Sequence, residues 1–128
     1  MAKLAYDEVL YWQRQGRTID LTMWYVIVNY RENPSWNPKA VGKNFKDGVL
    51  VSFDMGLGQV NTGVPRMQMK LLDPRHNIKR SIEILAEKNE TFAKGSKWHT
   101  FKYYNGSGEK AVKYATICWH HYTKLKGA

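Results

Sequence analysis

Hydrophobic residues recur at helical intervals through the second half of the chain. Ile78, Ile82 and Leu85 follow one another at i, i+4 and i+7, which places them on one face of a helix. Asp73 and Pro74 precede them as a helix cap and a first-turn proline. A second stripe predicts a C-terminal helix whose apolar face carries Ala111, Ala115, Cys118, Tyr122 and Leu125.

The first half begins with two predicted helices. Residues 4–15 predict a short helix that ends at Gly16, and Asp20 is placed to cap a second helix that runs to about Glu32. The centre of this second helix, residues 23–28, is apolar on every side, so we expect it to be buried all round. A core strand is the alternative, because the run is short and partly β-branched.

A hairpin and a further short helix complete the predicted elements. Asp47-Gly48 is a hairpin turn signal, with residues 43–45 and 49–51 as its flanking strands. Residues 97–103 predict a short helix that the polar loop 105–108 closes. The expected fold is therefore α+β, mostly α-helical with one small β-hairpin, in a single domain over residues 1–128.

The charge of the chain indicates a polyanionic partner. The 128 residues include 20 Lys plus Arg against 11 Asp plus Glu, a formal net charge of +9. Residues 87–128 hold eight lysines and three acidic residues, which is +5 of that total. Nucleic acid, a membrane surface and an acidic cell wall all fit this charge. The hydrophobic content of 43% is enough for a packed core and excludes wholesale disorder.

Several other classes are excluded by what the sequence lacks. The most apolar segment, residues 21–28, is far shorter than the ~20 residues of a membrane span, and charged residues interrupt any signal-peptide-like stretch at the N-terminus. The single cysteine, Cys118, excludes an internal disulfide. Adjacent helical residues such as His120 and His121 point about 100° apart, so we expect surface histidines, no metal site and no cofactor.

Two acidic residues stand out as candidate catalytic groups. Glu32 follows the apolar run at 23–28, so its carboxyl is expected beside apolar walls, and desolvation would raise its pKa toward that of a general acid. Asp54 supplies a second carboxylate on the far side of the predicted hairpin. Two carboxylates in differing environments across a cleft are the arrangement that glycoside hydrolysis uses.

Polar and glycine residues beside Asp54 predict a sugar-binding segment. The amides of Gln59 and Asn61 are two residues apart and share one face if the segment is extended. Such amides suit sugar hydroxyl and acetamido groups. Gly56 and Gly58 allow the backbone to approach a ligand closely.

Five short motifs occur in the order found in the lysozyme-like superfamily, and the chain most closely resembles the soluble lytic transglycosylase type of peptidoglycan-cleaving domain. The motifs are Glu32-Asn33-Pro34-Ser35-Trp36-Asn37-Pro38, Gly56-Leu57-Gly58-Gln59-Val60-Asn61, Asp73-Pro74-Arg75-His76-Asn77-Ile78, Tyr104-Asn105-Gly106 and the late Tyr114-Ala115. The resemblance runs from about residue 20 to 125. It implies a mostly helical fold with a hairpin lining the cleft.

The resemblance also implies an activity. The substrate would be the β-1,4 bond between N-acetylmuramic acid and N-acetylglucosamine in peptidoglycan, with Glu32 as general acid and base. Ser52, Gln59, Asn61, Tyr104 and Tyr114 would bind the glycan strand. Asp54 falls where animal lysozymes keep a second catalytic carboxylate, although the Asp of similar phage and secretion-system domains is not necessarily catalytic. The product, a reducing end or a 1,6-anhydro end, stays open.

Three departures separate the chain from the family pattern. The spacing from Glu32 to Trp36 is one residue longer, Asn33 replaces a serine, and Gly58 replaces a methionine that lines the cleft. We expect the last change to alter the preference for sugars. We also expect a monomer that acts in the periplasm or cell wall, as a phage lysin, a virion-associated protein or a secretion-system enzyme.

A basic single-stranded nucleic-acid-binding module is the alternative from another class. Aromatic residues alternate with lysines near the C-terminus, as in proteins that stack bases. The helical stripe favours a different interpretation, in which the aromatic residues are core and the lysines are solvated. We therefore expect no specific nucleic-acid partner.

Overall fold

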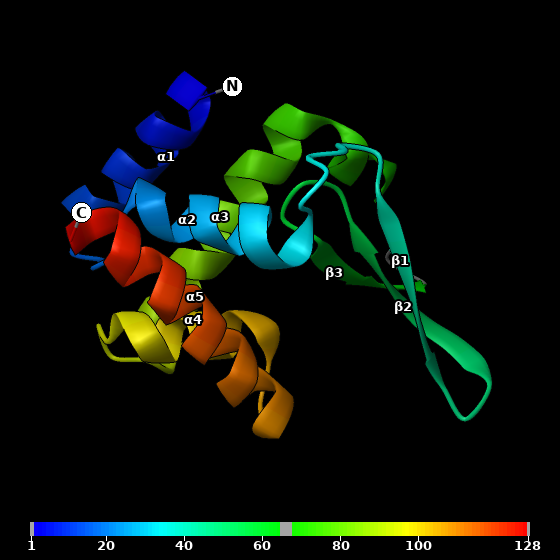
Figure 1. The fold of residues 1–128 in the computed structure, drawn as a ribbon. Coiled ribbons are helices and arrows are strands. Elements are labelled where there is room, and N and C mark those ends of the chain that lie inside the picture. The colour runs from blue at the N-terminus through cyan, green and yellow to red at the C-terminus, as the bar shows by residue number, and fades with distance from the viewer. Residues whose placement is uncertain (1, 65–67, 128) are drawn as a thin grey trace.

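The fold is mixed α and β, as the sequence predicts, and a computed structural model describes residues 2–64 and 68–127. The helices gather on one side of the molecule and a small antiparallel sheet extends from the other (Figure 1). Both ends of the described chain lie on the helical side, away from the sheet (Figure 1). Within these residues, none of the helices combines the length and apolar character needed to cross a membrane.

The five predicted helical regions are helical in the structure. The α-helices are α1 (Ala2–Arg14), α2 (Leu21–Ile27), α3 (Pro74–Thr91), α4 (Lys97–Asn105) and α5 (Glu109–Gly127). Local capping explains several of their starts, because the side chains of Asp20, Asp73 and Ser96 accept backbone N–H hydrogen bonds from the first turns of α2, α3 and α4. A short 3₁₀ turn, η3 (Met69–Leu72), leads into α3.

The second predicted helix ends in a wider turn than a regular α-helix. After α2 the chain continues as a π-helical segment, η1 (Val28–Glu32), in which the N–H of Asn33 bonds to the carbonyl of Val28 at 2.9 Å. The helix interpretation of residues 21–32 is therefore confirmed. The expectation of burial all round is wrong, because Tyr25 is 40% exposed while its neighbours are buried.

The sheet has one strand more than the predicted hairpin. Strands β1 (Val41–Lys46) and β2 (Val49–Met55) form the hairpin around Asp47-Gly48, both at positive φ as such a tight turn requires. A third strand, β3 (Val60–Gly63), pairs antiparallel with β2 to give the order β1-β2-β3. Strand β3 was not predicted, because four residues are too few to show a clear alternating pattern.

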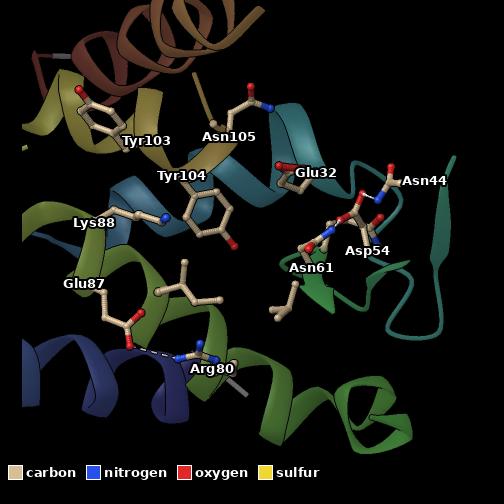
Figure 2. A pocket seen from close by; sticks show the side chains of 14 residues that line it. Glu32, Asn44, Asp54, Asn61, Arg80, Glu87, Lys88, Tyr103, Tyr104 and Asn105 are labelled. Carbon is tan, nitrogen blue, oxygen red and sulfur yellow. Dashed lines mark hydrogen bonds and ion pairs between the residues drawn. The ribbon is translucent and has the colours of Figure 1, made fainter. Parts of the chain in front are cut away.

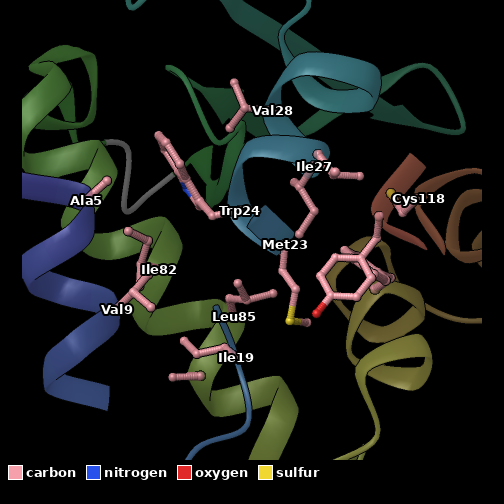
Figure 3. Packing of buried hydrophobic residues seen from close by; sticks show 14 of the residues in the cluster. Ala5, Val9, Ile19, Met23, Trp24, Ile27, Val28, Ile82, Leu85 and Cys118 are labelled. Carbon is pink, nitrogen blue, oxygen red and sulfur yellow. The ribbon is translucent and has the colours of Figure 1, made fainter. Parts of the chain in front are cut away.

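The main hydrophobic core lies between the helices. It contains Met23 and Ile27 from α2, together with apolar side chains of α1, α3, α4 and α5 (Figure 3). Ile78, Ile82 and Leu85 are buried as their spacing predicts, and so are Ala111, Ala115, Cys118 and Tyr122. Leu125 departs from its stripe, with 47% of its surface exposed, because α5 runs past the core at this end. A smaller cluster of Met55, Val60 and Leu71 lies between the sheet and η3.

Candidate functional site

A cavity of about 590 Å³ lies between the sheet, α3 and the end of α4. Polar side chains form most of its wall (Figure 2). The lining residues are Glu32 of η1; Asn44, Asp54, Gln59, Val60 and Asn61 of the sheet and its turn; Arg80, Ile84, Glu87 and Lys88 of α3; and Tyr103, Tyr104, Asn105 and Gly106 at the end of α4. Five of the seven residues predicted for the site line this cavity, namely Glu32, Asp54, Gln59, Asn61 and Tyr104.

Glu32 enters the cavity from the last residue of η1 (Figure 2). Its Oε1 accepts a hydrogen bond of 3.1 Å from the hydroxyl of Tyr114. Burial raises the pKa of Glu32 from its ordinary value of 4.5 to about 7. The hydrogen bond from Tyr114 and the charge of Arg31 act against this rise in pKa, whereas the negative charge of Asp54 adds to it. A carboxyl with this pKa holds its proton in an appreciable fraction of molecules near neutral pH.

Asp54 faces the cavity from β2 in a different environment. Its Oδ2 accepts a hydrogen bond of 2.9 Å from the amide of Asn44, and its Oδ1 accepts one of 2.9 Å from the amide of Asn61. The same two amides also donate to the hydroxyl of Ser52, each at 3.1 Å. The cavity therefore holds two carboxyl groups that differ in their surroundings.

Strand register brings these four residues together. Asp54 pairs directly with Asn61 across β2 and β3, and Asn44 pairs with Ser52 across β1 and β2. Ser52 and Asp54 are two residues apart in one strand and so share a face. Asn44 reaches that face because the register of β1 shifts between Asn44 and Phe45. Asn44 was not among the predicted site residues, since no local signal in the sequence marks a β-bulge there.

Gln59 lines the cavity but does not have the predicted extended conformation. Its φ is +48°, and its side-chain amide turns back to donate to the carbonyls of Ala40 at 3.2 Å and Gly56 at 2.9 Å. The turn between β2 and β3, not a continuous strand, places Gln59 next to Asn61. The amide nitrogen of Gln59 therefore secures the turn. The extended segment is not found, but Gln59 and Asn61 still line the same cavity.

Tyr104 and Gly58 meet at the wall of the cavity. The hydroxyl of Tyr104 donates to the carbonyl of Gly58 at 2.8 Å. A Cβ atom on Gly58 would lie 2.4 Å from Cβ of Ser81 and 3.0 Å from the Tyr104 hydroxyl, so the turn packs directly on α3. The expectation that Gly58 lets the backbone approach a ligand closely is therefore wrong, because Ser81 and Tyr104 already fill the space beside its Cα atom.

Ser52 and Tyr114 lie outside the described residues that line the cavity. Ser52 serves the Asn44–Asp54–Asn61 network as a hydrogen-bond acceptor. Tyr114 is 2% exposed and contacts Glu32 from α5, on the protein side of the carboxyl. The hydroxyl of Tyr114 is therefore in position to lower the pKa of Glu32.

Buried asparagines fix the turn that carries the site. Asn77 of α3 is fully buried, donates to the carbonyls of Met55 and Leu71 at 2.7 and 2.9 Å, and accepts from the N–H of Gly58 at 2.8 Å. Asn33, directly after Glu32, donates to the carbonyl of Gly56 at 3.2 Å. These contacts tie the sheet to α3 and to η1.

The α3 wall contains charged residues that the sequence analysis did not select. Arg80 forms ion pairs with Glu83 and, at 3.3 Å, with Glu87. Lys88 follows on the same helix, beside Tyr103 of α4. None of the sequence motifs includes these residues. Their position in the wall of the cavity follows only from the packing of α3 against α4.

The structure offers no candidate metal centre among residues 2–64 and 68–127. No group of three or more His, Cys, Asp or Glu side chains there is arranged to hold an ion. His121 stacks on Tyr30 of η1 with ring centroids 3.7 Å apart, and the neighbouring His120 ring is tilted by 72° to it. Cys118 is buried and its pKa is raised to about 12 by burial, as expected of a core thiol.

Comparison of the chain with protein-family models, with curated proteins and with solved structures found no match.

Proposed function

We propose that the protein is a glycosidase that cleaves the β-1,4 bond between N-acetylmuramic acid and N-acetylglucosamine in peptidoglycan. The observation that carries the proposal is the pair of unlike carboxyl groups in one cavity. Glu32 has a pKa of about 7 because it is buried, and Asp54 accepts two amide hydrogen bonds. This is the division of roles that glycosidic cleavage requires of an acid and an ionised partner.

In the proposed mechanism, Glu32 protonates the glycosidic oxygen as the bond from that oxygen to C1 breaks. The carboxylate of Asp54 stabilises the positive charge that develops at C1 as this bond breaks. The deprotonated Glu32 then accepts a proton from a water molecule whose oxygen bonds to C1, which restores the acid and leaves a reducing end. General acid and base catalysis of this kind contributes a factor of roughly 10²–10⁴ in rate.

The presence of Asp54 in the cavity favours hydrolysis over formation of a 1,6-anhydro end. In the second reaction the C6 hydroxyl of the muramic acid attacks C1, and a single acidic group suffices. Asn61 and the Oε1 of Gln59 remain in place to contact sugar polar groups at the sheet side. The net charge of +9 would attract the protein to an anionic envelope and would do so less at high salt.

The decisive experiment combines wall lysis with product analysis. Purified peptidoglycan is treated with the wild-type protein and with Glu32→Gln, which keeps the size of the side chain and its acceptor oxygen toward Tyr114. We expect soluble muropeptides from the wild type alone, with reducing ends by mass spectrometry. Anhydro products lack one water and would indicate the transglycosylase branch. Near-wild-type lysis by Glu32→Gln would refute the proposal.

The nucleic-acid alternative has less support from the aromatic residues. Phe101 and Tyr122 are buried, and Tyr104 is committed to Gly58, so these rings are not available for base stacking. A salt-dependent shift of a single-stranded oligonucleotide, together with an absence of wall lysis, would favour that alternative.

A further inference from the structure

Lys88 brings a positive charge to one end of the cavity. Its amine points from α3 toward the space beside Tyr104, while Asp54 and Asn61 lie on the opposite, sheet side (Figure 2). The Nζ atom lies 5.0 Å from the ring centroid of Phe92, and that ring packs at 5.3 Å on Tyr103. The sheet end of the cavity is therefore rich in amides and carboxylates, and the α4 end combines aromatic rings with a cation.

The carboxylates of α3 are already paired with other residues. Glu83 and Glu87 both contact Arg80, and Glu90 binds Arg17 at 2.6 Å. Within residues 2–64 and 68–127, no carboxylate lies within ion-pair distance of Lys88. The charge of Arg80 is therefore balanced by carboxylates of its own helix, whereas the charge of Lys88 remains available to a ligand.

A glycan strand bound across the two carboxyl groups would extend along the cavity toward Lys88. Peptidoglycan strands differ from chitin in one relevant way, because every second sugar carries a lactyl group that ends in a carboxylate or in a stem peptide with its own carboxylates. A half-buried ammonium with no carboxylate partner among the described residues is suited to bind such an anion.

We propose that Lys88 binds a carboxylate carried by a muramic acid residue near the cleaved bond, and that this contact makes the cavity prefer muramyl strands to uncharged chitin strands. The inference rests on the proposed function and specifies its substrate. Lys88 is a specificity-determining residue in this proposal and takes no part in the bond cleavage itself.

Binding to uncut oligomers tests the proposal. Affinities are measured by tryptophan fluorescence in the Glu32→Gln background, which prevents turnover, for Lys88→Met and for Lys79→Met. Lys79 is an exposed lysine on the same helix, and nine residues of separation place it on the opposite side of α3. Three ligands are compared: peptide-free strands with lactyl carboxylates, strands with stem peptides, and chitin oligomers.

We expect Lys88→Met to weaken binding of carboxylate-bearing strands by about threefold to tenfold and to leave chitin binding unchanged, with no effect of Lys79→Met. A loss confined to one of the two anionic ligands identifies which carboxylate is bound. An equal loss on chitin, an equal loss in Lys79→Met, no loss, or no binding of any oligomer would overturn the proposal. Failure of the proposed function is distinct, because it would be an absence of wall lysis by the wild type while carboxylate-selective binding persists.

Discussion

The hydroxyl of Tyr114 lies 3.1 Å from Oε1 of Glu32 and reaches it from α5, 82 positions further along the chain. Burial raises the pKa of Tyr114 well above its ordinary value, so this hydroxyl stays protonated and acts as a donor. A donor to a carboxylate favours the ionised form and lowers its pKa. The contact therefore holds the pKa of Glu32 below the value that burial alone would give.

Removal of this donor should shift the pH dependence of activity upward. Since Glu32 has a pKa of about 7, we expect wall lysis by the wild type to fall as the pH rises through about 7, where the acid loses its proton. Tyr114→Phe removes only the hydroxyl, so the alkaline limb of the pH–rate profile should move to higher pH. Tyr104→Phe is the matched control, because its hydroxyl donates to Gly58 instead. A profile that does not move in Tyr114→Phe would contradict this role.

Glu32→Gln should be more stable than the wild type at alkaline pH. The folded-state pKa of Glu32 is raised from 4.5 to about 7, so the folded protein binds this proton more tightly than the unfolded chain. Stability is therefore fully present below pH 4.5 and is lost as the pH rises toward 7. The variant escapes this loss, so its advantage in free energy of unfolding should grow from near zero at pH 4 to about 2–3 kcal/mol at pH 8.

Denaturant unfolding at the two pH values measures this difference. Glu109→Gln changes an exposed carboxyl in the first turn of α5 and serves as the control. An advantage for Glu32→Gln that is the same at pH 4 and pH 8 would show that the carboxyl is not destabilised by its burial.

Asp54→Asn tests the role of the second carboxylate. The substitution keeps the size of the side chain and removes the negative charge, so we expect the rate of wall lysis to fall by roughly 10²–10³-fold if that charge stabilises the transition state. Asp47→Asn is the control, because Asp47 lies in the hairpin turn and does not line the cavity. This variant should lyse peptidoglycan at the wild-type rate. Retained activity with 1,6-anhydro products would instead identify Glu32 as sufficient and the enzyme as a transglycosylase.

Two glycines at positive φ should differ sharply in their tolerance of alanine. Gly48 has a φ of +78° and open space around it, so Gly48→Ala should cost about 1 kcal/mol of stability from backbone strain alone. Gly56 has a φ of +75°, and a Cβ there would lie 2.2 Å from Nδ2 of Asn77, so Gly56→Ala should cost about 3 kcal/mol or more. Thermal unfolding of the two variants compares them directly, and equal costs would mean that the Asn77 contacts adapt easily.

Local signals in the sequence were enough to predict the helices and the hairpin. Asp20 and Asp73 cap helices through residues two or three positions away, and Asp47-Gly48 defines a two-residue turn by itself. The candidate acid was also marked locally, by the apolar run that precedes Glu32 in the sequence.

The remaining features depend on contacts between distant residues. Without the bulge, Asn44 would pair with Val51 and point away from Asp54. No neighbouring residues in the sequence indicate this shift in strand register. The left-handed backbone of Gln59 is held by the carbonyl of Ala40, 19 positions earlier. The direction of Lys88 likewise follows from how α3 and α4 are arranged around the cavity, which no local pattern encodes.

The wide turn of η1 allows one helical segment to direct its first residues toward the core and its last residue, Glu32, toward the cavity. The α-helical residues Met23, Trp24, Val26 and Ile27 direct their side chains to the core at the angular step of an α-helix. A π-turn changes that step without leaving a backbone N–H unpaired. The π-turn therefore changes the direction in which the following side chains point. Glu32 can then point away from the core within a single turn. A regular α-helix through the same residues would point the carboxyl in a different direction, so the site depends on the wide turn itself.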